Sequence, residues 1–206
     1  MTILHPSTRA AARALCLAAL AALSLWAVTP ARAEQPLAPK AEGPLAAILE
    51  KIPADGGKAG RDVAEALVGL GPKGVADVAA LVVEPGKGDD SQARYAIHAL
   101  AIHVARPGAE AERQMFCKAL RGLLDGPVPT PVKAFYVQQL RLMACPGAVP
   151  ALRTVLLDEA LCEDAAQALV SIGGDEAAAA LRDALPKAEG KCRLTIVQNL
   201  GVLRDA

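Results

Sequence analysis

Aromatic side chains are scarce in this chain, which has one Trp, two Tyr and two Phe among 206 residues. Trp26 lies in the N-terminal segment, so only four aromatic residues remain beyond it. A core must therefore be built from Ala, Leu and Val, and such small side chains let helices approach one another closely. Strict alternation of apolar and polar residues is also absent, so no segment stands out as a β-strand. The expected fold class is all-α.

The chain also lacks a surplus of either charge, with 22 Lys and Arg against 22 Asp and Glu. Three basic residues, Arg9, Arg13 and Arg32, lie within residues 1–33, so residues 34–206 keep 19 basic and 22 acidic side chains, a net charge of −3. Nucleic-acid binding is not expected, because no basic surplus is present to neutralise phosphates. After the N-terminal apolar run, no further run is long enough to span a bilayer.

That N-terminal run has the pattern of a secretory signal peptide. Arg9 and Arg13 precede an uncharged apolar run of 15 residues at 14–28, which is short for a transmembrane helix. The small-residue motif A-R-A that ends at Ala33 is typical of a signal-peptidase site. We expect cleavage between Ala33 and Glu34, and a periplasmic or secreted protein with no membrane contact afterwards. An uncleaved N-terminal anchor is the alternative.

One helical pattern recurs over residues 43–206. Aligned on a single leucine, its copies are headed by Leu67, Leu100, Leu140, Leu169 and Leu200, at spacings of 33, 40, 29 and 31 residues. The residues four and three before this leucine are apolar or small in every copy, which makes the stripe of an amphipathic helix. A period of this length in a helical chain indicates an α-solenoid, in which stacked helix pairs share one continuous core.

Glycine and proline mark the breaks between the helices, since glycine closes a helix and proline fits the first turn of the next. Residues 34–42 are polar, contain two prolines and are expected to form a flexible lead-in. The expected helix pairs are 44–52 with 58–70, 72–83 with 90–104, 108–124 with 131–144, 148–157 with 159–172, and 175–185 with 189–204. The expected architecture is thus an α-solenoid of about five helix pairs.

Two of these pairs resemble a known family. Residues 149–158 (VPALRTVLLD) and 162–173 (CEDAAQALVSIG) resemble HEAT repeats of the short, bacterial, phycobilisome-lyase-like type. Residues 177–185 (AAAALRDAL) and 197–205 (VQNLGVLRD) are similar to the HEAT region of large exported bacterial proteins, which sometimes carry a C-terminal hydrolase or carbohydrate-binding module. The resemblance covers residues 43–206 and implies a scaffold whose second helices line a concave surface. It carries over no catalytic residues, because HEAT repeats have none in common.

Four cysteines lie beyond residue 33, an even number in a protein expected to fold outside the cytoplasm. The repeat frame places Cys117 and Cys145 at one rim of their pair, and Cys162 and Cys192 near the starts of consecutive second helices. We expect the disulfides Cys117–Cys145 and Cys162–Cys192, each closing a loop of about thirty residues worth ~3 kcal/mol. The alternative is four buried free thiols that pack as small hydrophobic side chains.

The few histidines give no metal site. No C-x-x-C pair is present, and His98 and His103 are five residues apart, about 140° around a helix, so they cannot bind one metal from one face. His103 takes a core position of the repeat, where we expect a half-buried, hydrogen-bonded histidine. No local pairing of a nucleophile with a base is present either. The sequence therefore predicts no metal, no cofactor and no catalytic residue.

A polar residue stands two positions before the aligned leucine in every copy. Five positions before it lie Tyr95 and Phe135, which we expect to be adjacent aromatic residues on the concave surface that the resemblance implies. Together these positions form a candidate binding face: Glu65, Tyr95, His98, Phe135, Gln138, Gln167 and Gln198. A groove for a peptide or a partner helix would use exposed aromatics as anchors. The alternative is the solvated polar side that every amphipathic helix needs.

These observations predict a non-enzymatic scaffold, outside the cytoplasm, that binds a protein or peptide partner. A first alternative is that the chain is the N-terminal positioning module of a larger secreted enzyme. A second alternative is a lyase-like protein that handles tetrapyrroles, an analogy that rests on the fold alone. The expected final helix carries Leu194, Val197, Leu200 and Leu203 on its stripe. We expect that the array breaks off here, so that the chain is a fragment or covers this face by self-association.

Overall fold

The computed structural model describes residues 39–52 and 57–204, and within these ranges the regular structure is helical, with no strand. The expected all-α class is therefore confirmed for the described residues. The predicted signal peptide, its Ala33–Glu34 cleavage site and most of the lead-in lie outside them. Within the described part of the chain, no helix is long and apolar enough to cross a membrane.

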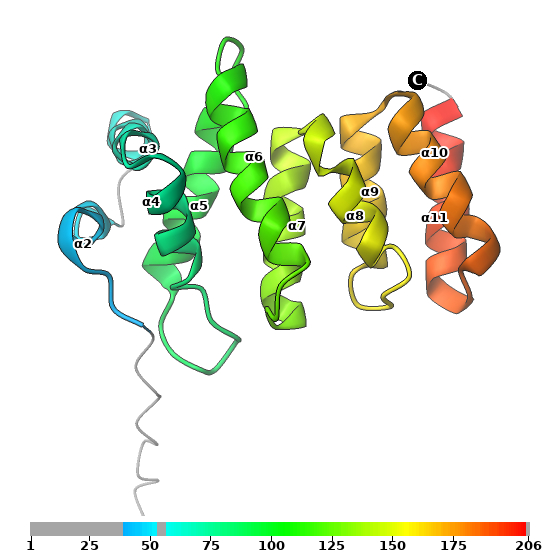
Figure 1. Ribbon diagram of the computed structural model, residues 1–206, viewed down its shortest axis with the longest axis horizontal. Helices are drawn as coiled ribbons and strands as arrows, with labels where there is room; N and C mark the ends of the chain where they lie inside the picture. Colours follow the sequence, from blue (N-terminus) through cyan, green and yellow to red (C-terminus); the bar gives the residue numbers. More distant parts are fainter. Residues whose placement is uncertain (1–38, 53–56, 205–206) are drawn as a thin grey trace, which may run out of the picture. The chain divides into compact units, whose positions relative to one another are not determined.

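Ten α-helices and two short 3-10 helices make up the described ranges (Figure 1). In chain order they are α2 (Gly43–Leu49), α3 (Lys58–Gly69), α4 (Gly71–Ala79), α5 (Ser91–Val104), α6 (Glu110–Leu124), α7 (Thr130–Met143), η1 (Pro146–Ala148), α8 (Val149–Val155), α9 (Cys162–Ile172), α10 (Gly174–Ala184), η2 (Leu185–Lys187) and α11 (Gly190–Arg204). All ten helices match predicted ones, and the differences are confined to their ends.

Two helix ends differ from prediction for local reasons. Helix α4 stops at Ala79 rather than at residue 83. The backbone then changes to hydrogen bonds between residues three apart instead of four, such as that of Val82 N to the Ala79 carbonyl at 3.1 Å. Helix α9 begins at Cys162 rather than at residue 159, because Asp158 holds the preceding turn. The Asp158 side chain accepts a hydrogen bond from the Ala160 amide at 2.9 Å, an arrangement that favours a turn over a helix.

The helices contact one another in two rows. The first helices of the pairs contact in the order α2, α4, α6, α8 and α10, and the second helices in the order α3, α5, α7, α9 and α11. Each first helix also contacts the second helix of its own pair, and Figure 1 shows the pairs following one another in chain order. The shared core lies between the rows: Leu67, Leu100, Leu140 and Leu169 are fully buried, and only Leu200 of the last helix is half-buried.

A tyrosine ties the two rows together. Tyr136 on α7 is 2% exposed, and its hydroxyl donates a hydrogen bond of 2.8 Å to the carbonyl of Ala79 at the end of α4. Burial raises the pKa of Tyr136 to about 12, so the hydroxyl keeps its proton and remains a donor. The ring thus fills volume in the core, and its hydroxyl bonds to the carbonyl of a buried residue in another helix pair.

The connection between α4 and α5 is held by an arginine and an aspartate. Asp90 accepts a hydrogen bond from the Val83 amide at 2.9 Å and pairs with Arg94 Nε at 2.9 Å. Arg94 in turn donates from Nη2 to the Val83 carbonyl at 2.9 Å, and its guanidinium lies over the ring of Phe135 on α7, 4.8 Å from the centroid. These contacts close the loop and cover one face of Phe135.

Candidate binding face

The five polar positions of the repeat lie on consecutive second helices, one on each of α3, α5, α7, α9 and α11. The side chains at these positions are exposed, except for that of Gln167, which is half-buried. In chain order they are Glu65, His98, Gln138, Gln167 and Gln198. Since each second helix contacts the next, these positions form one continuous row, which we call the polar row.

Members of the polar row join neighbouring helices. His98 Nδ1 lies 3.1 Å from Gln139 Oε1 on α7, and Gln138 donates to Asp164 on α9 at 3.4 Å. Arg141 on α7 also donates to Gln167 on α9. Part of this row therefore fixes the spacing of the second helices. Sequence reasoning missed Gln139, which is 3% exposed, because its neighbour Gln138 already filled the polar position of the repeat.

The two aromatic residues of the predicted face are not exposed anchors. Tyr95 and Phe135 are both half-buried and pack against the core. Phe135 contacts the ring of Tyr136, with centroids 5.8 Å apart, and Arg94 covers it from the preceding helix. The expectation of exposed aromatics was wrong because the position five before the leucine faces the previous second helix. Stacking hides that position, which a single helix would leave on its polar side.

Exposed apolar residues occupy another position on the same side of the second helices. The position two residues after the aligned leucine holds Ile102 on α5, which is 57% exposed, and Leu142 on α7, which is 43% exposed. They lie four residues, about one helical turn, beyond the polar row and therefore share its face. In the sequence, this position is apolar in three copies, as Ile102, Leu142 and Val202. Gly69 and Ser171 occupy it in the other two copies, so it does not stand out as a continuous stripe.

A groove of about 400 Å³ lies beside Ile102, between α3 and α5. Tyr95, His98 and Ile102 line it from α5, and Gly60 and Arg61 line it from α3. Gly60 leaves this space open because it has no side chain. A Cβ added at this position would lie 3.7 Å from the Tyr95 hydroxyl. The groove therefore offers an apolar wall with a cationic side chain at its edge. Such a surface suits an apolar side chain next to an acidic group.

The chain was compared with protein-family models, curated proteins and solved structures. No match was found in any of the three. The function proposed below is therefore inferred from the residues of this chain.

Among residues 39–52 and 57–204, no group of three or more His, Cys, Asp or Glu side chains is placed to hold a metal ion.

A buried histidine closes one end of the groove. His103 is 8% exposed and takes the same core position as Leu70 and Met143 in neighbouring copies. Its Nε2 lies 3.7 Å from Glu112 Oε2, and Arg106 Nη2 lies 2.9 Å from the same oxygen. Burial, aided by the positive charge of Arg106, lowers the pKa of His103, although Glu112 acts in the opposite direction. His103 is therefore held as a neutral imidazole.

We expect His103 to make the protein sensitive to acid. The pKa of an unfolded histidine is about 6.5, and the folded value lies below it, so the stability due to neutral His103 is present above that pH and is lost as the pH falls below it. His103→Leu should reduce the loss of unfolding free energy between about pH 7.5 and pH 5.5, measured by urea unfolding. Glu112→Gln should enlarge that loss, since it lowers the pKa of His103 further. An unchanged acid loss in His103→Leu would contradict the expectation.

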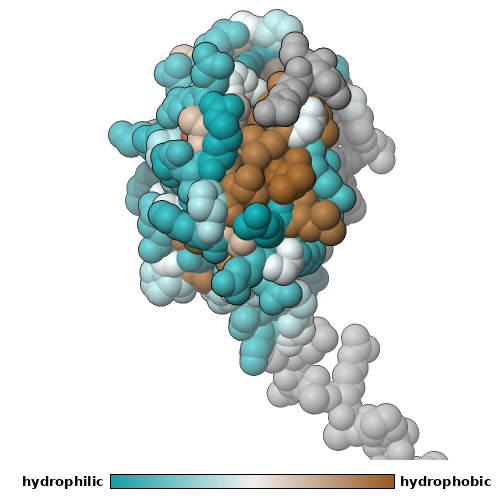
Figure 2. Space-filling view, turned by 90° about the vertical axis from the view of Figure 1, so that its right-hand side faces the viewer, coloured by the Kyte–Doolittle hydropathy of each residue, from teal (hydrophilic) through white to brown (hydrophobic). Residues whose placement is uncertain are grey.

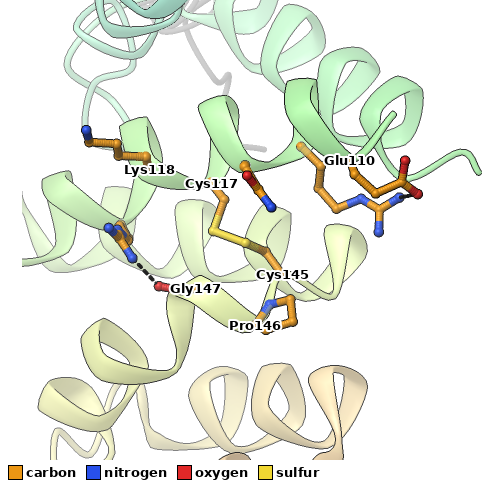
Figure 3. A pocket seen from close by; sticks show the side chains of 9 residues that line it. Glu110, Cys117, Lys118, Cys145, Pro146 and Gly147 are labelled. Atoms are coloured by element: carbon orange, nitrogen blue, oxygen red, sulfur yellow. Dashed lines mark hydrogen bonds and ion pairs between the residues drawn. A yellow bond between two sulfur atoms is a disulfide. The ribbon is translucent and has the colours of Figure 1, made fainter. Parts of the chain in front are cut away.

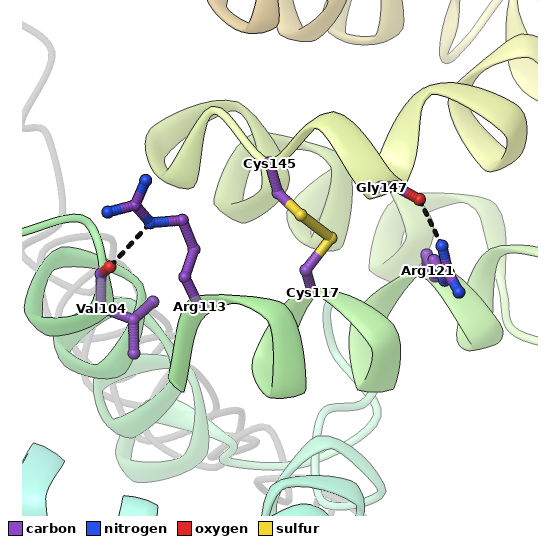
Figure 4. The surroundings of a disulfide bond; sticks show 6 residues. All are labelled: Val104, Arg113, Cys117, Arg121, Cys145 and Gly147. Atoms are coloured by element: carbon purple, nitrogen blue, oxygen red, sulfur yellow. Dashed lines mark hydrogen bonds between the residues drawn. A yellow bond between two sulfur atoms is a disulfide. The ribbon is translucent and has the colours of Figure 1, made fainter. Parts of the chain in front are cut away.

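The structure joins Cys117 on α6 to Cys145, which directly precedes η1, as the repeat frame favoured (Figure 4). Both residues are buried, and their Cα atoms are 6.4 Å apart. Ala144 ends α7 in the left-handed conformation, with φ 47°, and so turns the chain back toward α6. A non-glycine residue in this conformation is uncommon.

The predicted second disulfide, between Cys162 and Cys192, is absent. Both residues are buried free thiols, at the start of α9 and in the first turn of α11. Burial, together with the neighbouring Cys192 thiol, raises the pKa of Cys162 to about 12. The two thiols therefore pack as the predicted alternative has it, as small buried hydrophobic side chains.

A second hollow, of about 530 Å³, lies over the disulfide, where α6 meets η1 (Figure 3). Its arginines are engaged by backbone carbonyls. Arg113 donates to the carbonyl of Arg106 at 3.1 Å. Figure 4 shows that Arg113 also donates to the carbonyl of Val104, at 3.0 Å, and that Arg121 donates to that of Gly147. These contacts hold the end of α5 and the turn η1 against α6. We assign this hollow a structural role.

Proposed function

We propose that this protein is an exported, non-enzymatic scaffold, a HEAT-like α-solenoid that binds a segment of a partner protein across its second helices. The observation that carries the proposal is the groove beside Ile102, with the exposed Leu142 at the same repeat position on the next helix. Two exposed apolar side chains on adjacent helices, next to an open groove, fit two apolar side chains of one bound segment. The polar row then contacts the remainder of that segment.

The charge beside the groove limits the chemistry of the partner. Arg61 and Arg106 both line the groove. Arg106 forms an ion pair with Glu112 at 2.9 Å, so its charge is already partly balanced. Arg61 is exposed on α3, where it can meet an anionic group. A favourable segment would therefore place a large apolar side chain in the groove and an Asp or Glu within about one turn of it. Exposed apolar side chains of this kind act as the anchors of an interface.

Peptide selection tests this function. We expect peptides selected from a random library on the purified protein to share a large apolar residue with an acidic neighbour. Ile102→Glu should weaken their binding by ~10-fold or more, since truncating an anchor costs more than about 1.4 kcal/mol. Gly60→Leu should weaken it similarly by filling the groove. Leu157→Glu, at an apolar residue 46% exposed and outside the groove, is the matched control and should bind normally. Equal binding to all three variants would refute the proposal.

A further inference from the structure

Three positions of each second helix face the next second helix. They lie six and three residues before the aligned leucine and one residue after it, and we call them the forward stripe. Their contacts run in chain order: Arg94 lies over Phe135, Arg141 donates to Gln167, and Glu163 pairs with Lys191 at 3.0 Å. At the central position the side chain is fully buried in the four second helices that another second helix follows within the described residues, as Ala64, Ile97, Val137 and Ala166.

The forward stripe of α11 consists of Leu194, Val197 and Gly201, and no element among the described residues covers it. Leu194 is 60% exposed, Val197 is 50% exposed, and Gly201 is exposed as well. Figure 2 looks onto this end of the described unit and shows an apolar patch surrounded by polar residues. Of the four apolar residues expected on this face, Leu200 and Leu203 are half-buried against the core instead. This patch continues the interface by which every earlier second helix meets its successor.

The residues by which a second helix contacts the preceding second helix disfavour one way of covering this stripe, the head-to-tail stacking of copies. A second helix contacts the preceding second helix through the residues five and two before its aligned leucine, as Phe135 and Gln167 show. On α3 these positions are Asp62 and Glu65, both exposed, and Asp62 pairs with Lys58 at 2.8 Å. Head-to-tail stacking of copies would therefore press apolar side chains onto carboxylates, which would lose their water.

The α11 stripe is complementary to itself. Leu194 and Gly201 are seven residues apart, two helical turns, and so lie on the same side of the helix. If two α11 helices pack antiparallel about an axis between Val197 and Gln198, the midpoint of residues 194 and 201, each Leu194 meets the Gly201 of the other helix. An added Cβ at Gly201 would meet nothing within 4 Å, so the space for this leucine is open. The largest side chain of the stripe thus opposes the position that has none.

We propose that a second copy of this chain docks on the α11 stripe, antiparallel, and forms a two-fold symmetric dimer. Such an interface is closed, because the same patch serves both copies and leaves none open for a third. It goes beyond the binding function proposed above and does not rest on it, because the groove and Leu142 lie on α3, α5 and α7, and α11 carries only Gln198 of the polar row. The dimer would bring two binding faces into one assembly and allow two-site binding to a partner with repeated segments.

Sedimentation of the full protein tests the dimer. We expect a mass of two chains at concentrations of about 10 µM and above, and a shift to one chain in Val197→Glu, which puts two carboxylates beside the axis. Leu142→Glu, an exposed apolar position on α7, is the matched control and should stay dimeric. A monomeric wild type would overturn the proposal. Open-ended oligomers would also overturn it, in favour of head-to-tail stacking.

A swap of the large and small residues tests the packing itself. Gly201→Leu should weaken dimerisation by ~10-fold or more, because it sets a leucine against Leu194 of the other copy. Adding Leu194→Ala should restore the dimer, since the double variant exchanges the large and small positions under the same two-fold axis. Helix content, measured by circular dichroism, should not change in any of these variants, because the altered side chains are exposed. A double variant as weak as Gly201→Leu alone would rule out the antiparallel register.

Discussion

Replacing Tyr136 with alanine is expected to lower the free energy of unfolding by about 3–5 kcal/mol, the cost of emptying a large buried site. The ring is 2% exposed, and its hydroxyl reaches the end of α4 at the Ala79 carbonyl. A loss of this size is a large share of a domain's stability. Urea unfolding, followed by circular dichroism, measures it directly.

Tyr136→Phe separates the ring from the hydroxyl. This variant loses the hydrogen bond to the Ala79 carbonyl, which still accepts a bond of 3.1 Å from the Val82 amide. The expected cost is only about 1 kcal/mol, because the carbonyl keeps one partner. If both variants lost the same free energy, the hydroxyl and not the packing of the ring would hold the rows together.

Breaking the Cys117–Cys145 disulfide is expected to cost about 3–4 kcal/mol, the loop-entropy value for the 28 residues that separate the two cysteines. A reductant should therefore lower the urea midpoint of the protein, and the substitutions Cys117→Ser and Cys145→Ser together should lower it similarly. In that double variant, the reductant should have no further effect.

The free cysteines supply the matched control for this prediction. Replacing Cys162 and Cys192 with alanine should leave the sensitivity to reductant unchanged, because those thiols form no disulfide. A protein that lost its reductant response in this control would show that Cys162 and Cys192 are bonded in solution. Equal midpoints with and without reductant in the wild type would contradict a stabilising Cys117–Cys145 bond.

Many features of the candidate face could be read from the sequence, but its anchors could not. The polar row followed from one position of the repeat, because a 3.6-residue period places every such residue on the same side of its helix. Whether Phe135 is exposed depends on the neighbouring helix, and the Arg94 side chain that covers it belongs to another copy of the repeat. The same holds for Ile102, which lies beside a groove that α3 and α5 form together.

The cysteines show a similar division. The repeat frame brought each pair to a common rim, but two thiols that lie near each other form a bond only if their geometry and ionisation allow it. Cys117 and Cys145 are bonded across the turn that Ala144 makes. Cys162 and Cys192 lie inside the core as free thiols.

Over the described residues, the sequence by itself determined the helical class, the ten helices, their pairing and their buried stripes. These properties depend on local causes: glycine and proline at the breaks, and the spacing of apolar residues within single helices. The tertiary structure alone decided which side of each helix meets its neighbour, and hence that Phe135 is covered, that Ile102 borders a groove and that Leu194 and Val197 are left open. The physical reason is that burial at a stacked face depends on side chains from two different helices, whose relative position no single period encodes.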